Sequence, residues 1–154
     1  MLRRPRRLPG FDYVGFHRYS LRFCTHQRLR LFMSSEHVEA AQSQIQRTCD
    51  EEGFDLLAYC FMPDHVHLFM EGTRPTADLR RAVKLMKQRS AYVFRIRFGV
   101  RLLWQEGYYE RVLRNEESAS VVIRYFYDNP VRAGLVERYE DYPFLGGRYS
   151  PDWS

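Results

Sequence analysis

Two strand-like runs joined by the dipeptide Pro63-Asp64 constrain the fold of this 154-residue chain more than any other feature. Residues 54–62 and 65–71 are both rich in apolar and aromatic side chains, and both have the length of an ordinary strand. A turn of two residues can join only neighbouring antiparallel strands. The sequence therefore predicts a β-hairpin at the centre of the fold.

The segments on either side of this hairpin limit the fold class. Periodicity predicts further strands at 18–25 and 102–114, and helices at 35–52, 76–98 and 116–128. The expected helix starts are Ser34 or Ser35, Thr76 and Asn115, and Gly53 and Gly99 are expected stops. The order β-α-β-β-α-β-α predicts an α+β, ferredoxin-like fold: a four-stranded antiparallel sheet with two packed helices, plus a third helix.

Length and composition indicate one globular domain. We expect a basic arm over residues 1–10, a folded domain over 11–136 and a tail over 137–154. No apolar run approaches the roughly 20 residues that span a bilayer, and no secretion signal is recognisable, so no membrane partner is expected. Three cysteines, an odd number, favour buried thiols in a reducing cytoplasm over a disulfide framework.

The net charge of +5 comes from arginine and favours a polyanionic partner, most often nucleic acid. Two groups of basic residues are candidate contacts to DNA phosphates. A solvated helix face explains the second group equally well. The first group is Arg3, Arg4, Arg6 and Arg7 in the arm, and the second is Lys84, Lys87 and Arg89 in a predicted helix.

A pair of histidines lies inside the second strand of the hairpin. Successive side chains of a strand point to opposite faces, so His65 and His67 share one face while Val66, Leu68 and Met70 share the core face. Two imidazoles on one face can bind a metal ion, and histidines satisfied by ordinary hydrogen bonds are the alternative.

A second candidate segment ends the third predicted helix. Tyr125 and Asn129 are four residues apart and would share a face of a continuous helix, with Tyr125 as a nucleophile and Asn129 as a third metal ligand. Residues before proline avoid the helical region, which makes Asn129 a candidate helix end. Tyr127 is the competing nucleophile, and it lies about 200° around the helix from Tyr125, so only one of the two can face the site.

Four motifs in family order resemble the single-tyrosine HUH transposase superfamily, and within it most closely the REP-associated tyrosine transposases. The motifs are Met62-Pro-Asp-His65-Val-His67-Leu, Lys84-Leu-Met-Lys-Gln-Arg-Ser, Leu103-Trp-Gln-Glu-Gly-Tyr-Tyr and Tyr125-Phe-Tyr-Asp-Asn129-Pro-Val-Arg-Ala-Gly-Leu-Val. The resemblance implies a ferredoxin-like nuclease and strand transferase that acts on single-stranded DNA near hairpins. It also implies a cytoplasmic, nucleoid-associated bacterial protein that works as a monomer or homodimer.

The resemblance also implies roles for particular residues. His65 and His67 match the metal-binding pair, with Mg²⁺ or Mn²⁺ as the cofactor, and Tyr125 matches the nucleophile that forms a 5′-phosphotyrosine. Asn129 stands where insertion-sequence relatives usually have glutamine. Asp64 stands where asparagine is common, either as a simple turn residue or as a carboxylate that would repel DNA phosphate or tune His65.

Two other functions are compatible with the same residues. A non-catalytic, RNA-recognition-like module would bind single-stranded nucleic acid through sheet aromatics, for which Phe69 and Tyr59 are candidates. A hydrolytic zinc enzyme would need a third ligand, for which Cys60 is a candidate across the hairpin. Three further aromatics are candidates for stacking unpaired bases, with core packing as the alternative for the first: Trp104, Tyr108 and Tyr109.

Overall fold

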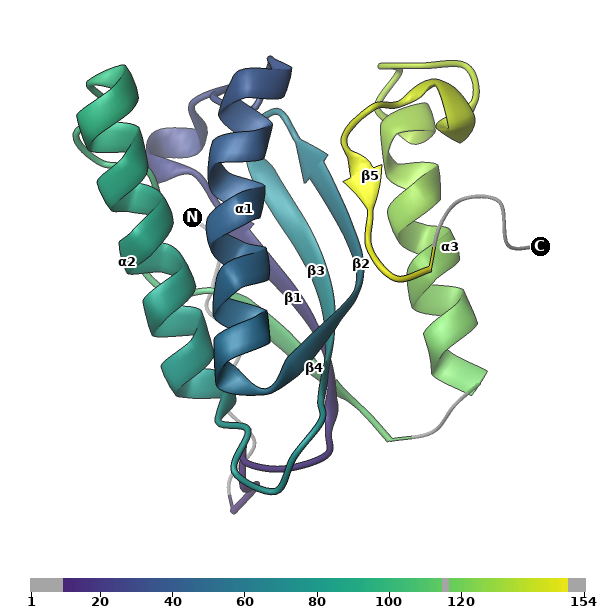
Figure 1. Cartoon of the computed structure of the whole chain (residues 1–154). Coiled ribbons are helices and arrows are strands. Elements are labelled where there is room, and N and C mark those ends of the chain that lie inside the picture. Colours follow the sequence, from purple (N-terminus) through teal and green to yellow (C-terminus); the bar gives the residue numbers. More distant parts are fainter. Residues whose placement is uncertain (1–9, 115–116, 150–154) are drawn as a thin grey trace.

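The computed structural model describes residues 10–114 and 117–149, which form a sheet with helices on both of its faces (Figure 1). The strands are β1 (Arg18–Cys24), β2 (Phe54–Met62), β3 (His65–Gly72), β4 (Tyr109–Leu113) and β5 (Leu145–Gly146). The helices are α1 (Ser35–Glu52), α2 (Leu79–Phe98) and α3 (Glu117–Arg132), with short 3₁₀ turns η1 (His26–Arg28) and η2 (Tyr139–Asp141).

The sheet has the order β4-β1-β3-β2-β5, and each neighbouring pair is antiparallel. Its first four strands, with α1 and α2 on one face, confirm the predicted ferredoxin-like fold. Figure 1 shows α3 on the opposite side of the sheet from α1 and α2, while β5 lies at the sheet edge next to β2. None of the helices in the described residues is long and apolar enough to cross a membrane.

The starts of the first two helices test the capping predictions. Ser34 caps α1 as expected, because its side chain accepts a hydrogen bond from the His37 backbone, and Gly53 ends the helix with a φ of 82°. The predicted start of the second helix at Thr76 is wrong, since the cap is Asp78. The preceding backbone is held extended by pairing with the N-terminal segment, where Val14 bridges Asp78.

Helix α3 continues through Pro130 to Arg132, so the prediction that it ends near Asp128 or Asn129 is wrong. The residue that terminates α3 is Gly134, which has a φ of 74°. The Leu135 amide donates to the Pro130 carbonyl and the Gly134 amide donates to the Val131 carbonyl, which is a Schellman ending. The longer helix keeps Asn129 helical and adds Arg132 to the same face as Tyr125.

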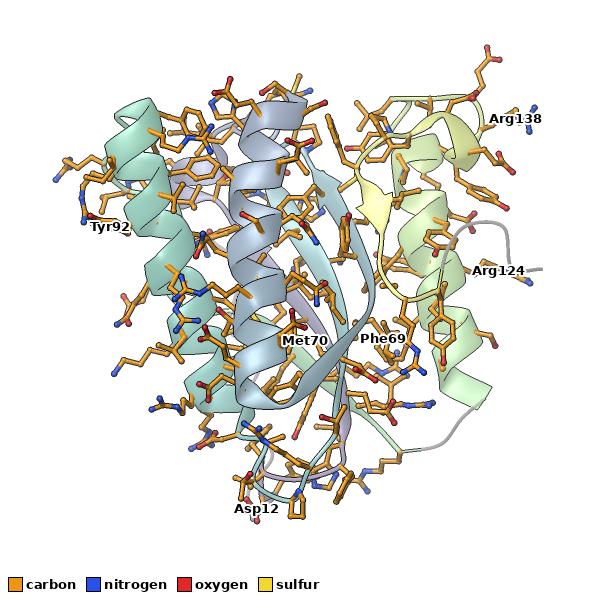
Figure 2. The ribbon with its side chains drawn as sticks, in the orientation of Figure 1. Asp12, Phe69, Met70, Tyr92, Arg124 and Arg138 are labelled. Atoms are coloured by element: carbon orange, nitrogen blue, oxygen red, sulfur yellow. The ribbon has the colours of Figure 1, made fainter. Side chains whose placement is uncertain are left out.

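The two faces of the sheet support two separate hydrophobic clusters. Val66, Leu68 and Met70 pack with the apolar faces of α1 and α2. Phe69 belongs to the second cluster, which includes Phe126 of α3. Figure 2 shows Met70 and Phe69 on opposite sides of the sheet, as the alternation along a strand requires.

The segment after α3 packs against the same domain. Strand β5 pairs with β2, and the Tyr142 hydroxyl donates to the Phe61 carbonyl. A register shift in β2 between Leu56 and Ala58 places Leu57 and Ala58 together in the second cluster. The boundary at residue 136 stays a prediction, although the described residues up to 149 continue the packing of the domain.

We expect Tyr142→Phe to lower the free energy of unfolding by about 1–2 kcal/mol, because it removes a buried hydrogen bond and leaves the ring in place. Urea unfolding followed by circular dichroism measures the change. The matched control is Tyr92→Phe, since Tyr92 is 57% exposed on α2 and its replacement should cost less than about 0.5 kcal/mol. Equal effects of the two substitutions would show that the segment after α3 is not part of the cooperative unit.

Candidate active site

The two histidines of β3 face α3, on the side of the sheet away from α1 and α2. Their ring centroids are 4.9 Å apart, and the His67 ring is 5.1 Å from that of Phe126. The predicted alternation along the strand is therefore confirmed. Helix α3 covers one side of the histidine pair, and this places the tyrosine segment beside it.

Asp64 orients the first histidine. Its Oδ1 lies 2.7 Å from His65 Nδ1, and its Oδ2 accepts a hydrogen bond of 3.0 Å from Arg28 Nε. A carboxylate partner keeps the proton on Nδ1, so the Nε2 lone pair of His65 is left available to a ligand. Both alternatives for Asp64 therefore hold: it is a turn residue, and it acts on His65.

Local electrostatics favour the neutral form of both imidazoles. Burial lowers the pKa of His65, an effect that Asp64 opposes. Burial lowers the pKa of His67 to about 3, and the positive charges of Arg22 and Arg132 act in the same direction. Burial by itself would raise the pKa of Asp64, but the hydrogen bonds from Arg28 and His65 prevail and lower it. The site at neutral pH therefore has two neutral nitrogen donors and an ionised carboxylate behind one of them.

The structure separates the two candidate nucleophiles. Tyr125 is 47% exposed, and its ring lies 5.9 Å from that of His67. Tyr127 is buried, its hydroxyl donates to the Tyr149 carbonyl, and its ring stacks on Tyr139. Only Tyr125 combines access to solvent with contact to the histidine pair.

Asn129 lies one turn after Tyr125 on the same face of α3. Its Oδ1 accepts a hydrogen bond of 2.8 Å from Arg132 Nη2, while its Nδ2 is buried with no hydrogen-bond partner. The Arg132 guanidinium also lies 4.5 Å from the centre of the Tyr125 ring. One arginine therefore contacts both the candidate nucleophile and the candidate third ligand.

A donor set of two imidazoles and one amide oxygen would suit Mn²⁺ or Co²⁺ and would accommodate Mg²⁺ less readily. The described residues contain no cluster of three or more His, Cys, Asp or Glu side chains able to hold a metal ion. Cys60 is directly opposite His67 on β2, but burial raises the pKa of its thiol to about 12. Cys60, His65 and His67 do not form a metal-holding cluster in the described residues, and this does not favour the hydrolytic zinc alternative.

The basic residues of α2 lie on the layer away from the histidines. Lys87 Nζ donates to the carbonyls of Gln105 and Gly107, and Arg89 pairs with Glu51 of α1 at 2.8 Å. Lys84 is exposed on the same helix. These contacts favour a scaffold role for Lys87 and Arg89. The arm residues Arg3, Arg4, Arg6 and Arg7 lie outside the described residues, so their role stays a prediction.

The aromatics proposed for an RNA-recognition-like surface do not form one. Phe69 is fully buried beneath α3, and Tyr59 belongs to the cluster on the opposite face of the sheet. Trp104 is a core residue whose Nε1 donates to Ser90 Oγ. Tyr109 differs, because it lies on the histidine face, directly across β1 from the hairpin strand.

Sequence reasoning missed the basic residues on β1. Arg22 is directly opposite His67 on one side and Tyr109 on the other, so these three side chains share a face. Arg18 of the same strand pairs with Glu71 at 3.1 Å. The alternation at 18–24 indicates that Arg22 lies on the polar face of its strand. Only the pairing of β1 with β3 shows that this face is the one that carries the histidines.

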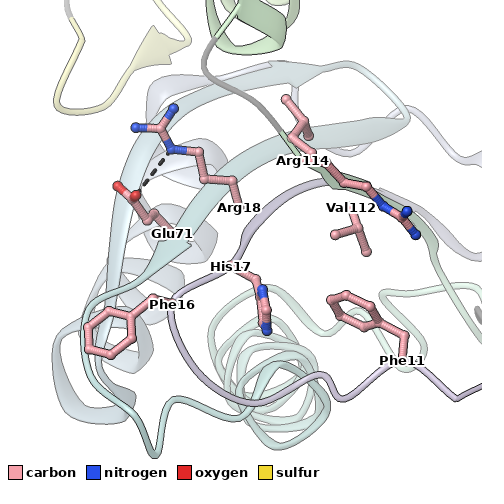
Figure 3. Close-up of a pocket in the computed structure, with 8 residues that line it drawn as sticks. Phe11, Phe16, His17, Arg18, Glu71, Val112 and Arg114 are labelled. Carbon is pink, nitrogen blue, oxygen red and sulfur yellow. Dashed lines mark hydrogen bonds and ion pairs between the residues drawn. The ribbon is translucent and has the colours of Figure 1, made fainter.

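A hollow of about 440 Å³ lies at the far end of the same strands (Figure 3). Glu71 is four residues from His67, a distance of roughly 13 Å along a strand. The lining of the hollow combines aromatic rings with charged groups, as do sites that hold unpaired bases. The lining includes Phe11, Phe16, His17, Arg18, Glu71 and Arg114.

A ferredoxin-like sheet with two histidines beside a tyrosine-bearing helix defines a transposase-type catalytic domain. Residues 14–129 match the family described as "Transposase IS200 like", and the chain belongs to this family. It is therefore related to enzymes that act on DNA.

Relatives of known name agree with this assignment. A Haemophilus influenzae protein named "Putative REP-associated tyrosine transposase" is 24% identical over 122 residues, covering 71% of this chain and 68% of the relative. The REP-associated tyrosine transposase of Escherichia coli K12 is 26% identical over 108 residues, covering 66% of this chain and 63% of the relative. The resemblance inferred from the sequence motifs is confirmed.

A solved structure shows the same fold over almost the whole chain. It is a REP-associated tyrosine transposase bound to a REP hairpin, with a TM-score of 0.79 and 20% sequence identity. The similarity covers 99% of this chain and 92% of the other. Strand β5 and helix α3 therefore lie within the part of this chain that the structural similarity covers.

We expect the metal-free protein to lose stability as the pH falls from about 6.5 towards 3, partly through His67. The folded state keeps this imidazole neutral, whereas the unfolded chain takes up a proton below about pH 6.5, so acid favours unfolding. His67→Gln should lose less stability between about pH 7.5 and about pH 5 than the parent. Urea unfolding in EDTA measures the difference, and parallel losses in the two proteins would contradict the assignment.

Proposed function

We propose that this protein is a metal-dependent endonuclease and strand transferase for single-stranded DNA, and that Tyr125 is its nucleophile. The observation that carries the proposal is the placement of Tyr125, half-exposed against His67, while Tyr127 is buried and hydrogen-bonded elsewhere. Membership of the transposase family supports the class of reaction.

In the proposed step, Tyr125 Oη attacks the phosphorus of a phosphodiester. The Oη–P bond forms as the P–O3′ bond breaks, the phenol loses its proton, and the departing 3′ oxygen gains one. The product is a 5′-phosphotyrosine and a free 3′ hydroxyl. The covalent bond conserves the linkage, so a second 3′ hydroxyl can attack it and join the strands without ATP.

We propose that His65 and His67 hold Mn²⁺ or Mg²⁺, with the Asn129 oxygen as third ligand. The bound cation would polarise the phosphate and stabilise the charge that develops on its oxygens. Asp64 keeps the His65 Nε2 lone pair free, and burial keeps His67 neutral. The Asn129 oxygen has a second lone pair beside the one that Arg132 uses.

A single-stranded substrate with a hairpin is proposed by analogy with the structural relative, which is bound to a REP hairpin. The aromatic and charged hollow at the end of β1 and β3 supports an unpaired strand, because stacking requires exposed base faces. Tyr125 contacts His67 of its own chain, so the proposed site is complete in one copy and needs no partner subunit.

We expect Tyr125→Phe to abolish the covalent protein–DNA adduct and to leave DNA binding almost unchanged, because only the attacking oxygen is lost. The assay mixes protein with end-labelled hairpin oligonucleotides from the DNA that adjoins the gene, in Mn²⁺ or EDTA. Denaturing gels then separate linked from free DNA.

Tyr127→Phe is the matched control, since it removes a hydroxyl two residues away and should keep the adduct. An adduct that survives in Tyr125→Phe and disappears in Tyr127→Phe would reverse the assignment. DNA binding without an adduct in any Mn²⁺ reaction would instead favour a non-catalytic binding module.

We expect Asp64→Ala to weaken Mn²⁺ binding by about 10–100-fold, because it releases the His65 ring from the carboxylate that orients it. Asp64→Asn keeps an acceptor oxygen and should cause a smaller loss. Isothermal titration of metal-free protein with Mn²⁺ measures both. Asp50→Ala, an exposed position on α1, is the control that should leave Mn²⁺ binding unaltered. Unaltered binding in Asp64→Ala would remove Asp64 from the proposed site.

A further inference from the structure

Arg22 is held beside His67 in a way that suits an anion. Its Cζ lies 4.2 Å from the centre of the Tyr109 ring, and this cation–π contact restrains the guanidinium. Its Nε is buried and has no hydrogen-bond partner. A buried donor without a partner is costly, and an incoming acceptor would remove that cost.

Arg132 approaches the same histidine from α3. Its guanidinium lies 4.5 Å from the centre of the Tyr125 ring and donates one hydrogen bond to Asn129. A guanidinium has five N–H donors, so most of its donors stay available. Arg132 is seven residues after Tyr125, and two helical turns return it to the same face.

Both arginines project positive charge onto the histidine site. Arg22 is directly opposite His67 in the pairing of β1 with β3, and Arg132 lies over the Tyr125 ring, which is itself 5.9 Å from the His67 ring. Neither has a carboxylate within ion-pair distance among the described residues, whereas Arg28 and Arg18 do. Two cations without an ion-pair partner, both close to one imidazole ring, attract an anion.

We propose that Arg22 of β1 and Arg132 of α3 form a two-sided binding site for a single phosphodiester, the one that Tyr125 attacks. Each guanidinium carbon lies over a tyrosine ring, 4.2 Å from the centre of the Tyr109 ring for Arg22 and 4.5 Å from that of Tyr125 for Arg132, and this contact restrains both side chains before the phosphate arrives. Pre-oriented donors of this kind lose little freedom on binding and hold the phosphate in line with the nucleophile. The identity of the phosphodiester rests on the proposed function, but the existence of the anion site does not.

The test is a scan with neutral linkages. In the Tyr125→Phe protein, with EDTA and low salt, fluorescence anisotropy measures binding of a flanked hairpin oligonucleotide in which one phosphate at a time is a methylphosphonate. We expect one position at which the neutral linkage weakens binding by about tenfold or more, because charged hydrogen bonds are lost there. Adding Arg22→Gln or Arg132→Gln should weaken binding of the unmodified DNA and make that position insensitive to the methylphosphonate.

The control is Arg95→Gln, because Arg95 also lies over a tyrosine ring, that of Tyr92, but on α2 in the opposite layer. It should keep the parent pattern of sensitive positions. Arg22→Lys retains the charge without the planar fork and should lie between the parent and Arg22→Gln. Thermal unfolding establishes that each variant is folded before it is scanned.

An unchanged scan in Arg22→Gln and Arg132→Gln would overturn the inference, whatever the cleavage assay shows. A scan that changes as expected would support the phosphate site even if no adduct ever forms. Failure of the anion site and failure of the proposed reaction are therefore distinguishable.

Discussion

The packing of Phe126 against the second face of the sheet is the contact on which the site depends. Phe126 is buried with Phe69 and lies against the His67 ring. This contact sets the rotation of α3, and its neighbour Tyr125 is carried to the rim of the interface, where it is half-exposed beside His67. A helix rotated by one residue would bury Tyr125 and expose Phe126, because successive residues differ by about 100° around the helix axis.

Local patterns predicted much of this arrangement, and the errors have physical causes. The two faces of the strand at His65 and His67 follow from alternation alone, since that rule needs no information from distant residues. The predicted end of α3 was wrong because Pro130 is a local stop signal, whereas the helix ends in a Schellman motif at Gly134. The role of Arg22 was missed since it depends on the register between β1 and β3, which no single strand encodes.

The charges of the site suit a substrate that is itself an anion. Asp64, the carboxylate hydrogen-bonded to His65, is neutralised by Arg28, and the two imidazoles are neutral. Arg22 and Arg132 therefore dominate the local field. Such a field destabilises a protonated His67 and attracts anions, so the same two arginines favour both the neutral imidazole and an anionic ligand beside it.

Helix α3 and the segment that follows it also determine which groups on this face of the sheet are accessible. In an RNA-recognition module the bases stack on an open sheet, but here α3 and the segment that follows it cover that face and bury Phe69 completely. Tyr125 and Arg132 stay exposed at the rim of this covered face, and Arg22 is half-buried. The third helix therefore removes the open sheet surface on which an RNA-recognition module would stack bases.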